Sequence, residues 1–444
     1  MKSSTFNIIV AMATMLTLAT GCSKSNDSNP TGPVIPGDAT TWVGTTIGDG
    51  SDAFEIRGKY VIKKGTYSLK GWVYVVNGSQ LYIEPGTIIK GDKATKATLI
   101  AEPGGQIFAE GTATEPIIMT SAQAPGSRKP GDWGGLVVCG NAVNNQGQMT
   151  IEGGLRTVHG GSNNADNSGV YRYIRIEFAG YPYATDQEIN GMTFGSVGSG
   201  TTVDHIQVSY SNDDSYEWFG GSVNCKYLVA YHGWDDDFDT DDGFSGNMQF
   251  LLGVRDPKIA DQSLSNGFES DNNASGSAAT PFTSAVFSNV TLIGPIGQDA
   301  NFANTTNYID GGGMNPNNGS RLGQFQAGAQ IRRNSRQSIL NSVIVGYPVG
   351  LIIENDKGSA TQSAATNGNL FVMNDYFANM TILGSDKNKT WLDQLSTDAT
   401  TLDPSQLSFS HSFFMMPANS NDSLGFVADL KLNQPNSTLA NPNY

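Results

Sequence analysis

The stretch that decides the fold is residues 210–272, YSNDDSYEWFGGSVNCKYLVAYHGWDDDFDTDDGFSGNMQFLLGVRDPKIADQSLSNGFESDN. In it an acidic cluster beside a Gly/Phe pair recurs roughly every 24 or 25 residues, and runs of β-forming residues separate the copies. A repeat of this length in a chain rich in glycine and asparagine predicts a solenoid, in which equivalent positions stack on one another. The acidic members of the three copies are Asp213, Asp214 and Glu217, then Asp239, Asp241 and Asp242, then Glu269 and Asp271.

Carboxylates stacked in this way repel one another, because neighbouring coils hold them about 5 Å apart. Two arrangements relieve the repulsion: the side chains extend into water, or they share a cation. A cation site and a ligand surface built on these acids both depend on one condition: Glu217, Asp241 and Glu269 must come into vertical register.

A second repeat lies nearer the N-terminus, where Glu-Pro-Gly triplets begin at Glu84 and Glu102. Each triplet has a short apolar run before it and another after it. Proline lacks an N–H donor and glycine accepts positive φ, so the triplet predicts a corner between strands. Because the copies are translated and not reversed, we expect strand, corner and strand to form one small coil of 18 residues.

Four segments together resemble right-handed parallel β-helix lipoproteins of Bacteroidota: EPGTIIKG (84–91), GGQIFAEGTATEPIIMTS (104–121), GDWGGLVVCGNA (131–142) and IEGG (151–154). The resemblance extends over about residues 70–380. It implies a fold and a location in the cell envelope. It implies little about activity.

The fold class expected is all-β, a single right-handed parallel β-helix with long loops on one side and a C-terminal cap. The helix is assigned to residues 42–390, and the long loops to 294–321 and 355–369. Residues 391–444 lose the repeat, so we expect them to cover the last coil and its unpaired strand edges, with a short helical piece at 390–395.

Residues 1–21 have the features of a secretory signal peptide, with a basic start, an apolar core and small residues before Cys22. The position of Cys22 resembles a bacterial lipoprotein signal, which implies lipidation of this residue and an anchor in the outer membrane. The alternative is an ordinary cleaved signal in which the cysteine is incidental. Residues 22–41 are rich in Ser, Asn, Pro and Gly, typical of a flexible tether.

The formal net charge of −15 argues against nucleic acid and anionic membrane surfaces as partners. It suits a secreted surface protein or one that binds cations. Beyond Cys22 there are two cysteines, Cys139 and Cys225, both in apolar strands. About four coils would separate them, so we expect buried thiols and no disulfide.

The strongest candidate site is the acidic repeat, because crowded oxygen ligands beside Gly-terminated turns suit Ca²⁺. It is not an EF-hand, since Asp242 stands where the essential glycine belongs and Met248 where the bidentate glutamate belongs. Ligands would come from neighbouring coils; the alternative is a solvated acidic corner. The candidate metal ligands are Asp213, Asp214, Glu217, Asp237, Asp239, Asp241, Asp242, Glu269 and Asp271.

Aromatic residues lie among these acids and suggest a glycan ligand, because aromatic faces stack on sugars. The candidate contacts are Tyr216, Trp218, Tyr231, His232 and Trp234. No complete catalytic motif is present: a pectinase-type pattern is only faintly echoed at 239–243, and no Gly-x-Ser-x-Gly elbow occurs.

The sequence therefore favours an outer-membrane-anchored, surface-exposed β-helix protein with a non-catalytic role, binding a ligand such as a glycan for an outer-membrane transporter. The first alternative is a polysaccharide lyase or glycoside hydrolase acting at the same acidic face. The second is a purely structural surface protein, which needs no site.

Overall fold

The computed structural model describes residues 31–184, 187–355, 357–358, 360–386 and 407–424. The predicted signal peptide, Cys22, the first part of the tether, the helical piece at 390–395 and most of the tail lie outside the described residues. Among the described residues, no helix combines the length and the apolar composition needed to cross a membrane.

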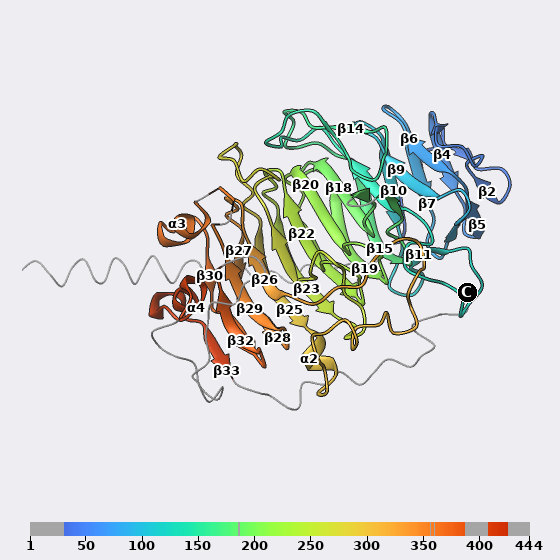
Figure 1. Ribbon diagram of the computed structural model, residues 1–444. Helices are drawn as coiled ribbons and strands as arrows, with labels where there is room; N and C mark the ends of the chain where they lie inside the picture. The colour runs from blue at the N-terminus through green and yellow to red at the C-terminus, as the bar shows by residue number, and fades with distance from the viewer. Residues whose placement is uncertain (1–30, 185–186, 356, 359, 387–406, 425–444) are drawn as a thin grey trace, which may run out of the picture. The chain divides into compact units, whose positions relative to one another are not determined.

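The described residues between 40 and 424 form a parallel β-helix built from an 18-stranded sheet, here called sheet A, and an 11-stranded sheet, sheet B. Each strand pairs in parallel with its equivalents on the neighbouring coils (Figure 1). The predicted all-β solenoid is confirmed. The strands of sheet B are β3 (Phe54–Ile56), β6 (Trp72–Val75), β9 (Thr98–Ala101), β12 (Gly135–Cys139), β18 (Met192–Val197), β20 (Tyr216–Gly221), β22 (Phe238–Asp241), β24 (Phe268–Ser270), β26 (Ala327–Ile331), β29 (Val349–Ile353) and β32 (Ile382–Ser385).

Sheet A contributes two strand positions to each coil, and in the middle coils the two merge into one long bent strand. Its strands are β1 (Thr40–Thr41), β2 (Thr46–Ile47), β4 (Lys59–Ile62), β5 (Thr66–Leu69), β7 (Gln80–Ile83), β8 (Ile88–Gly91), β10 (Gln106–Glu110), β11 (Ile117–Ser121), β15 (Gly169–Glu177), β19 (Thr202–Ser209), β21 (Cys225–Tyr231), β23 (Asn247–Val254), β25 (Val286–Ile293), β27 (Ser338–Leu340), β28 (Val343–Val345), β30 (Val372–Met373), β31 (Tyr376–Ala378) and β33 (Asp422–Leu424).

The predicted 18-residue coil is wrong. Gln80 pairs with Lys59 on one side and with Gln106 on the other, so successive coils are longer and unequal. The triplet at Glu84 follows β7, whereas the triplet at Glu102 follows β9. The two triplets are therefore different corners of the helix. The strand–corner–strand pattern misled the prediction because it occurs more than once in every coil.

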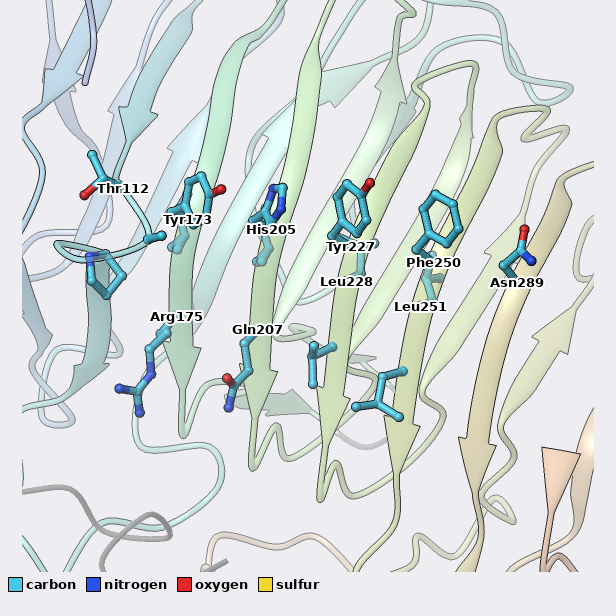
Figure 2. Close-up of a pocket in the computed structure, with 16 residues that line it drawn as sticks. Thr112, Tyr173, Arg175, His205, Gln207, Tyr227, Leu228, Phe250, Leu251 and Asn289 are labelled. Atoms are coloured by element: carbon cyan, nitrogen blue, oxygen red, sulfur yellow. The ribbon is translucent and has the colours of Figure 1, made fainter. Parts of the chain in front are cut away.

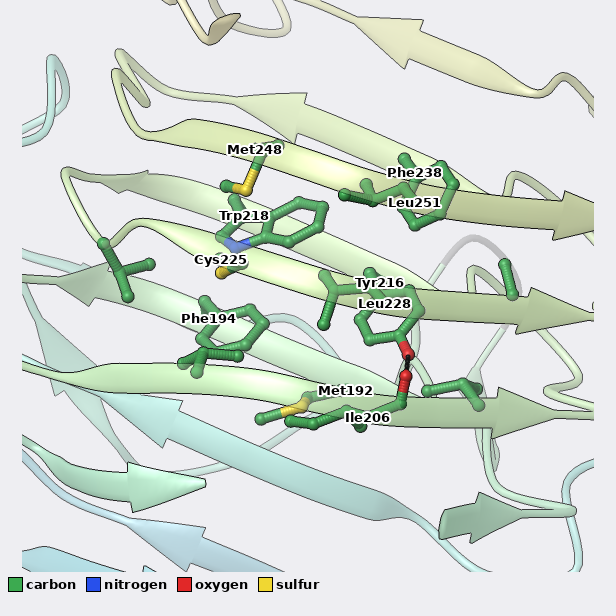
Figure 3. Close-up of a cluster of buried hydrophobic side chains, with 14 of the residues drawn as sticks. Met192, Phe194, Ile206, Tyr216, Trp218, Cys225, Leu228, Phe238, Met248 and Leu251 are labelled. Carbon is green, nitrogen blue, oxygen red and sulfur yellow. Dashed lines mark hydrogen bonds between the residues drawn. The ribbon is translucent and has the colours of Figure 1, made fainter. Parts of the chain in front are cut away.

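The core lies between the two sheets and consists of side chains that alternate inward along each strand. Tyr216 and Trp218 of β20 are fully buried there, and Phe194 stacks on Trp218 with ring centroids 5.4 Å apart (Figure 3). Phe238 continues the stack above Tyr216 at 5.5 Å. Such stacking adds about 0.5–1.5 kcal/mol per aromatic pair to the stabilisation from burial.

Long connections border both edges of sheet B. Residues 140–168 and 271–285 follow its strands, whereas 178–191, 255–267 and 294–326 precede them. Two hairpins and two short helices lie in such connections or in the similar one at 354–371. They are β13 (Met149–Thr150) with β14 (Val158–His159), β16 (Pro182–Ala184) with β17 (Gln187–Glu188), α2 (Pro295–Gln298) and α3 (Thr361–Thr366).

The described part of the tail closes the last coil. Helix α4 (Phe409–Phe414) packs on β29 and β32, and β33 adds a final parallel strand to β31. The 3₁₀ turn η2 (Pro417–Asn419) connects the two. Cys139 and Cys225 are buried free thiols.

Candidate cation site

Sheet B carries a column of carboxylates on its outer face. Glu217 of β20 lies directly opposite Asp239 of β22, which lies opposite Glu269 of β24. These three side chains alternate with the inward aromatic residues of the same strands, so they point away from the core. The predicted stacking of acids from successive coils is confirmed for this column.

A second acidic group occupies the corner by which the chain enters sheet B. Oxygen atoms of Asp213, Asp214 and Asp235 lie within 4.8 Å of one another. Oxygen atoms of Asp214, Glu217 and Asp239 lie within the same distance of one another. Asp214 belongs to both triads, so the corner and the column form one continuous acidic cluster.

Few cations face this cluster in the part of the chain that the structure describes. Arg332 contacts Glu269 and bonds to Asp271 through Nε at 2.8 Å, and Arg333 bonds to Asp271 at 2.5 Å. Both arginines therefore lie at the Glu269 end. The two triads around Asp214 have no ion pair with Lys, Arg or His among the described residues.

Burial and mutual repulsion make ionisation of the cluster unfavourable. Burial, and then the charge of Asp261, raises the pKa of Asp235 to about 8. Burial also raises the pKa of Glu217 and of Asp239 well above their usual range, with neighbouring carboxylates adding to the shift. A bound cation would remove this penalty, because it compensates the negative charge where the protein does not.

Several polar atoms beside the triads have no hydrogen-bond partner. Thr193 lies opposite Glu217 on β18, is 1% exposed, and its Oγ1 is unpartnered. Asn190 is fully buried and donates from Nδ2 to Glu217, while its own Oδ1 is unpartnered. Asp235 and Asp239 each keep one buried oxygen without a partner. Buried oxygen atoms left unsatisfied in this way fit ligands or neighbours of a cation.

Loops from the preceding coils cover the neighbouring outer face of sheet B. Ile151, Leu155 and Ile189 pack on Phe219 and Val137, in a cluster separate from the main core. The same loops bring Glu152 against Glu217. Burial raises the pKa of Glu152 to about 7, and the hydrogen bond with Glu217 opposes this shift. Glu152 thus forms part of the wall of the cluster.

The residues present fit Ca²⁺ better than a softer metal. The donors are carboxylate, amide and hydroxyl oxygens, the hard ligands that Ca²⁺ takes at 2.3–2.6 Å. Oxygen atoms within 4.8 Å of one another can all reach one ion at such a distance. The described candidate groups contain no histidine or cysteine, the ligands that zinc prefers.

Five predicted ligands lie outside the two triads: Asp237, Asp241, Asp242, Glu269 and Asp271. Asp237 is fully buried in an ion pair with Arg255 at 2.9 Å, so its charge is already compensated and its assignment as a metal ligand is wrong. Asp241 is in register with Phe219, not with Glu217. It lies two residues beyond Asp239 on β22, beside Asp242 and Asp271, and it belongs to neither triad.

The predicted aromatic ligand contacts are also largely wrong. Tyr216, Trp218 and Trp234 are fully buried, so none can present a ring face to a glycan. Tyr231 and His232 stack on each other at 3.8 Å and pack edge-on against Tyr210 at the end of β21. His232 is 8% exposed, and burial lowers its pKa to about 4.

The predicted ligand list omitted Asp235, although it lies in the candidate acidic stretch, and sequence reasoning missed Glu152, Asn190 and Thr193 as members of the site. Asp235 begins the acidic run 235–237, which precedes the acidic residues of the second repeat copy at 239–242. The other three come from loops or strands of earlier coils, and no local pattern marks them. A comparison of the coils in correct register would have found Thr193 alone.

The fold is that of a single parallel β-helix with long connections at both edges of sheet B. The chain belongs to the family of pectate-lyase-like β-helix domains, whose model matches residues 55–408. No curated protein and no solved structure matches the chain.

Proposed function

We propose that this protein binds Ca²⁺ in the acidic cluster on sheet B and acts as a non-catalytic, envelope-anchored binding protein. The observation that carries the proposal is the pair of carboxylate triads that share Asp214. They come from two successive coils, contain no compensating cation among the described residues, and include buried oxygens without partners.

The charge of the cluster favours a divalent cation over a purely structural acidic surface. Asp214 and Glu217 are each 6% exposed, so water cannot fully solvate their charges. The predicted alternative of a solvated corner requires exposed carboxylates. It suits Asp213 better than it suits these two residues, because Asp213 is half-buried.

The proposed location and partners rest on the N-terminal sequence. Residues 1–22 resemble a lipoprotein signal, and lipidated Cys22 would attach the protein to the outer membrane through a flexible tether. A binding protein held there would deliver its ligand to an outer-membrane transporter. Substituting Cys22→Ala tests the anchor: the protein should move from the membrane fraction to the soluble fraction, and retention in the membrane would contradict it.

The cation proposal is tested by titrating Ca²⁺ into the chelator-treated protein, with calorimetry and thermal unfolding as readouts. Wild-type protein should give a saturable heat and a higher melting temperature. The variant Glu217→Gln/Asp239→Asn should lose both, because two ligands of one triad become neutral. Asp52→Asn is the matched control: this exposed aspartate lies in an N-terminal coil, and its loss should change neither readout. Absence of heat and of any melting shift in the wild type would refute the proposal.

A uronate-specific polysaccharide lyase is the second candidate function. The observation that favours it is Glu152, whose pKa near 7 would let it exchange a proton beside the cluster. Incubation with polygalacturonate and Ca²⁺ tests it, since a lyase produces unsaturated uronate that absorbs in the ultraviolet. Product that Glu152→Gln abolishes would favour the enzyme, and no product under conditions where Ca²⁺ binds would favour the non-catalytic role.

A further inference from the structure

A groove of about 500 Å³ follows the bend of sheet A (Figure 2). None of its lining residues belongs to sheet B or to the acidic cluster. Four successive long strands, β15, β19, β21 and β23, each contribute three consecutive residues to it. The loop between β10 and β11 lines one end through Thr112, and Asn289 of β25 lines the other. The groove therefore runs across the strands, along the axis of the β-helix.

One wall is a row of stacked rings. Tyr173 stacks on His205 with centroids 4.3 Å apart, His205 on Tyr227 at 4.4 Å, and Tyr227 on Phe250 at 5.2 Å. Because the ring faces meet one another, the row offers mainly its edges to a ligand. Phe250, the last ring, is 43% exposed.

The floor and the opposite wall come from the next two residues of each strand. The floor is formed by residues such as Ile206 and Leu228, which are almost fully buried and pack in the main core, so little of their side chains is open to a ligand. The opposite wall changes from Arg175 and Gln207 to aliphatic side chains (Figure 2). The aliphatic surface that a ligand can reach therefore comes from Val229 and Leu252, which are partly exposed, whereas Arg175 and Gln207 make the other end of this wall polar.

The backbone marks this row of rings as unusual. All four ring residues have positive φ, between 50° and 63°, a conformation that bulky side chains rarely adopt. In the later coils the same bend position is filled by Asn289, Asn341 and Asn374, which tolerate positive φ well. Bulky rings held in an unfavourable conformation, where asparagine serves elsewhere in the same fold, suggest a functional role.

The charge of the groove points to a neutral ligand. Arg175 is the sole Arg, Lys, Asp or Glu among the lining residues, and it is ion-paired with Glu177 at 2.6 Å. Asp204 holds Nδ1 of His205 at 2.8 Å, so Nε2 is the ring nitrogen that a ligand can reach. Together with the hydroxyls of Tyr173 and Tyr227, this nitrogen supplies hydrogen-bonding groups at successive coils.

The spacing of the groove points to a polymer. Equivalent groups recur once per coil, about 4.8 Å apart, and a ligand that repeats at a similar interval meets the same groups again at each step. One β-linked pyranose unit has a comparable length, with hydroxyls around its edge and apolar C–H faces. We propose that this groove binds a linear neutral oligosaccharide. Its edge hydroxyls would bond to the polar atoms of Tyr173, His205 and Tyr227 and to Gln207, and its apolar faces would lie against Val229 and Leu252.

This inference goes beyond the cation site and is independent of it. Among the glycan contacts predicted from the sequence, Tyr216, Trp218 and Trp234 are fully buried, whereas the rings that line the groove lie on sheet A and are partly exposed. Binding in the groove therefore needs neither the acidic cluster nor a cation.

The test is calorimetric titration of the full-length protein with neutral hexamers of β-1,4-linked glucose, mannose and xylose, each with and without a chelator. At least one should bind, equally well in both conditions. Tyr227→Asn/Phe250→Asn should weaken that binding at least tenfold while the fold remains intact, because asparagine occupies the same backbone position in later coils. Phe371→Asn is the matched control, since it removes a 41% exposed ring that does not line the groove.

Three results would overturn the proposal. The first is absence of binding by all three hexamers at millimolar concentration. The second is unchanged binding by the Tyr227→Asn/Phe250→Asn variant, or equal weakening by the Phe371→Asn control. The third is binding only of a galacturonate hexamer, or of the apolar dye anilinonaphthalene sulfonate, since these would indicate an anionic or a simply hydrophobic occupant. Glu217→Gln/Asp239→Asn separates the two sites, because it should leave binding of the neutral hexamer unchanged.

Discussion

Asp237 lies directly before β22 and forms an ion pair with buried Arg255, whereas Asp239, two residues later in the strand, has no such partner among the described residues. Asp239 instead lies between Glu217 and Glu269 on the outer face of sheet B. Two residues of chain separate a compensated charge from an uncompensated one. The same aspartate-to-asparagine substitution should therefore have opposite effects at the two positions.

Asp239→Asn should stabilise the chelator-treated protein by up to about 1 kcal/mol. The reason is the loss of repulsion between like charges that lie directly opposite each other on adjacent strands. Urea unfolding at pH 8 without a cation measures the effect. A lower free energy of unfolding than wild type would mean that Asp239 makes a stabilising contact absent from this structure.

Asp237→Asn should destabilise the protein by about 3–5 kcal/mol in the same experiment, because it leaves the guanidinium of Arg255 buried without its partner. The double variant Asp237→Asn/Arg255→Met should recover part of this loss, since no unpaired charge then remains. Equal stability of the single and double variants would contradict the argument.

The cation-free protein should become less stable as the pH rises from about 5 to about 8. Burial and neighbouring acids raise the pKa of Asp235 to about 8 and that of Asp242 to about 7 in the folded protein. In the unfolded chain both carboxyls have a pKa of about 4. Their contribution to stability is thus complete below pH about 4 and is lost as the pH rises through the folded-state values.

Ca²⁺ binding near pH 7 should release protons for the same reason, because the cation favours ionised carboxylates. Calorimetry in two buffers of different ionisation enthalpy measures this release. Identical heats in both buffers would show that the ligands are already ionised before the cation binds.

Arg332→Gln should destabilise the cation-free protein and strengthen Ca²⁺ binding. The guanidinium contacts both Glu269 and Asp271, so its removal exposes their charges to each other and to Asp239. We expect a loss of about 1–3 kcal/mol in the free energy of unfolding, together with tighter binding. Weaker Ca²⁺ binding in this variant would instead show that Arg332 organises the ligands.

The sequence by itself determined the β-helix and the stacking of acids on successive coils. The repeat in residues 210–272 is long enough to fix one coil per copy, and parallel coils must place equivalent residues next to each other. The same sequence also determines where the rings point: in Tyr216-Glu217-Trp218, strict alternation along a strand puts both rings on the face opposite the acid. The prediction that these rings contact a ligand failed for that reason.

Only the tertiary structure decided register, partners and the extent of the site. Asp239 lies opposite Glu217, whereas Asp241, two residues further along β22, lies opposite Phe219. The lengths of the loops between coils set which of the two aspartates comes into register with Glu217. Arg255 pairs with Asp237 because the chain folds back at the end of β23. Glu152 reaches Glu217 from a loop two coils earlier, and the ring row of sheet A joins residues from four coils. Such contacts depend on distances in space that spacing along the chain does not encode.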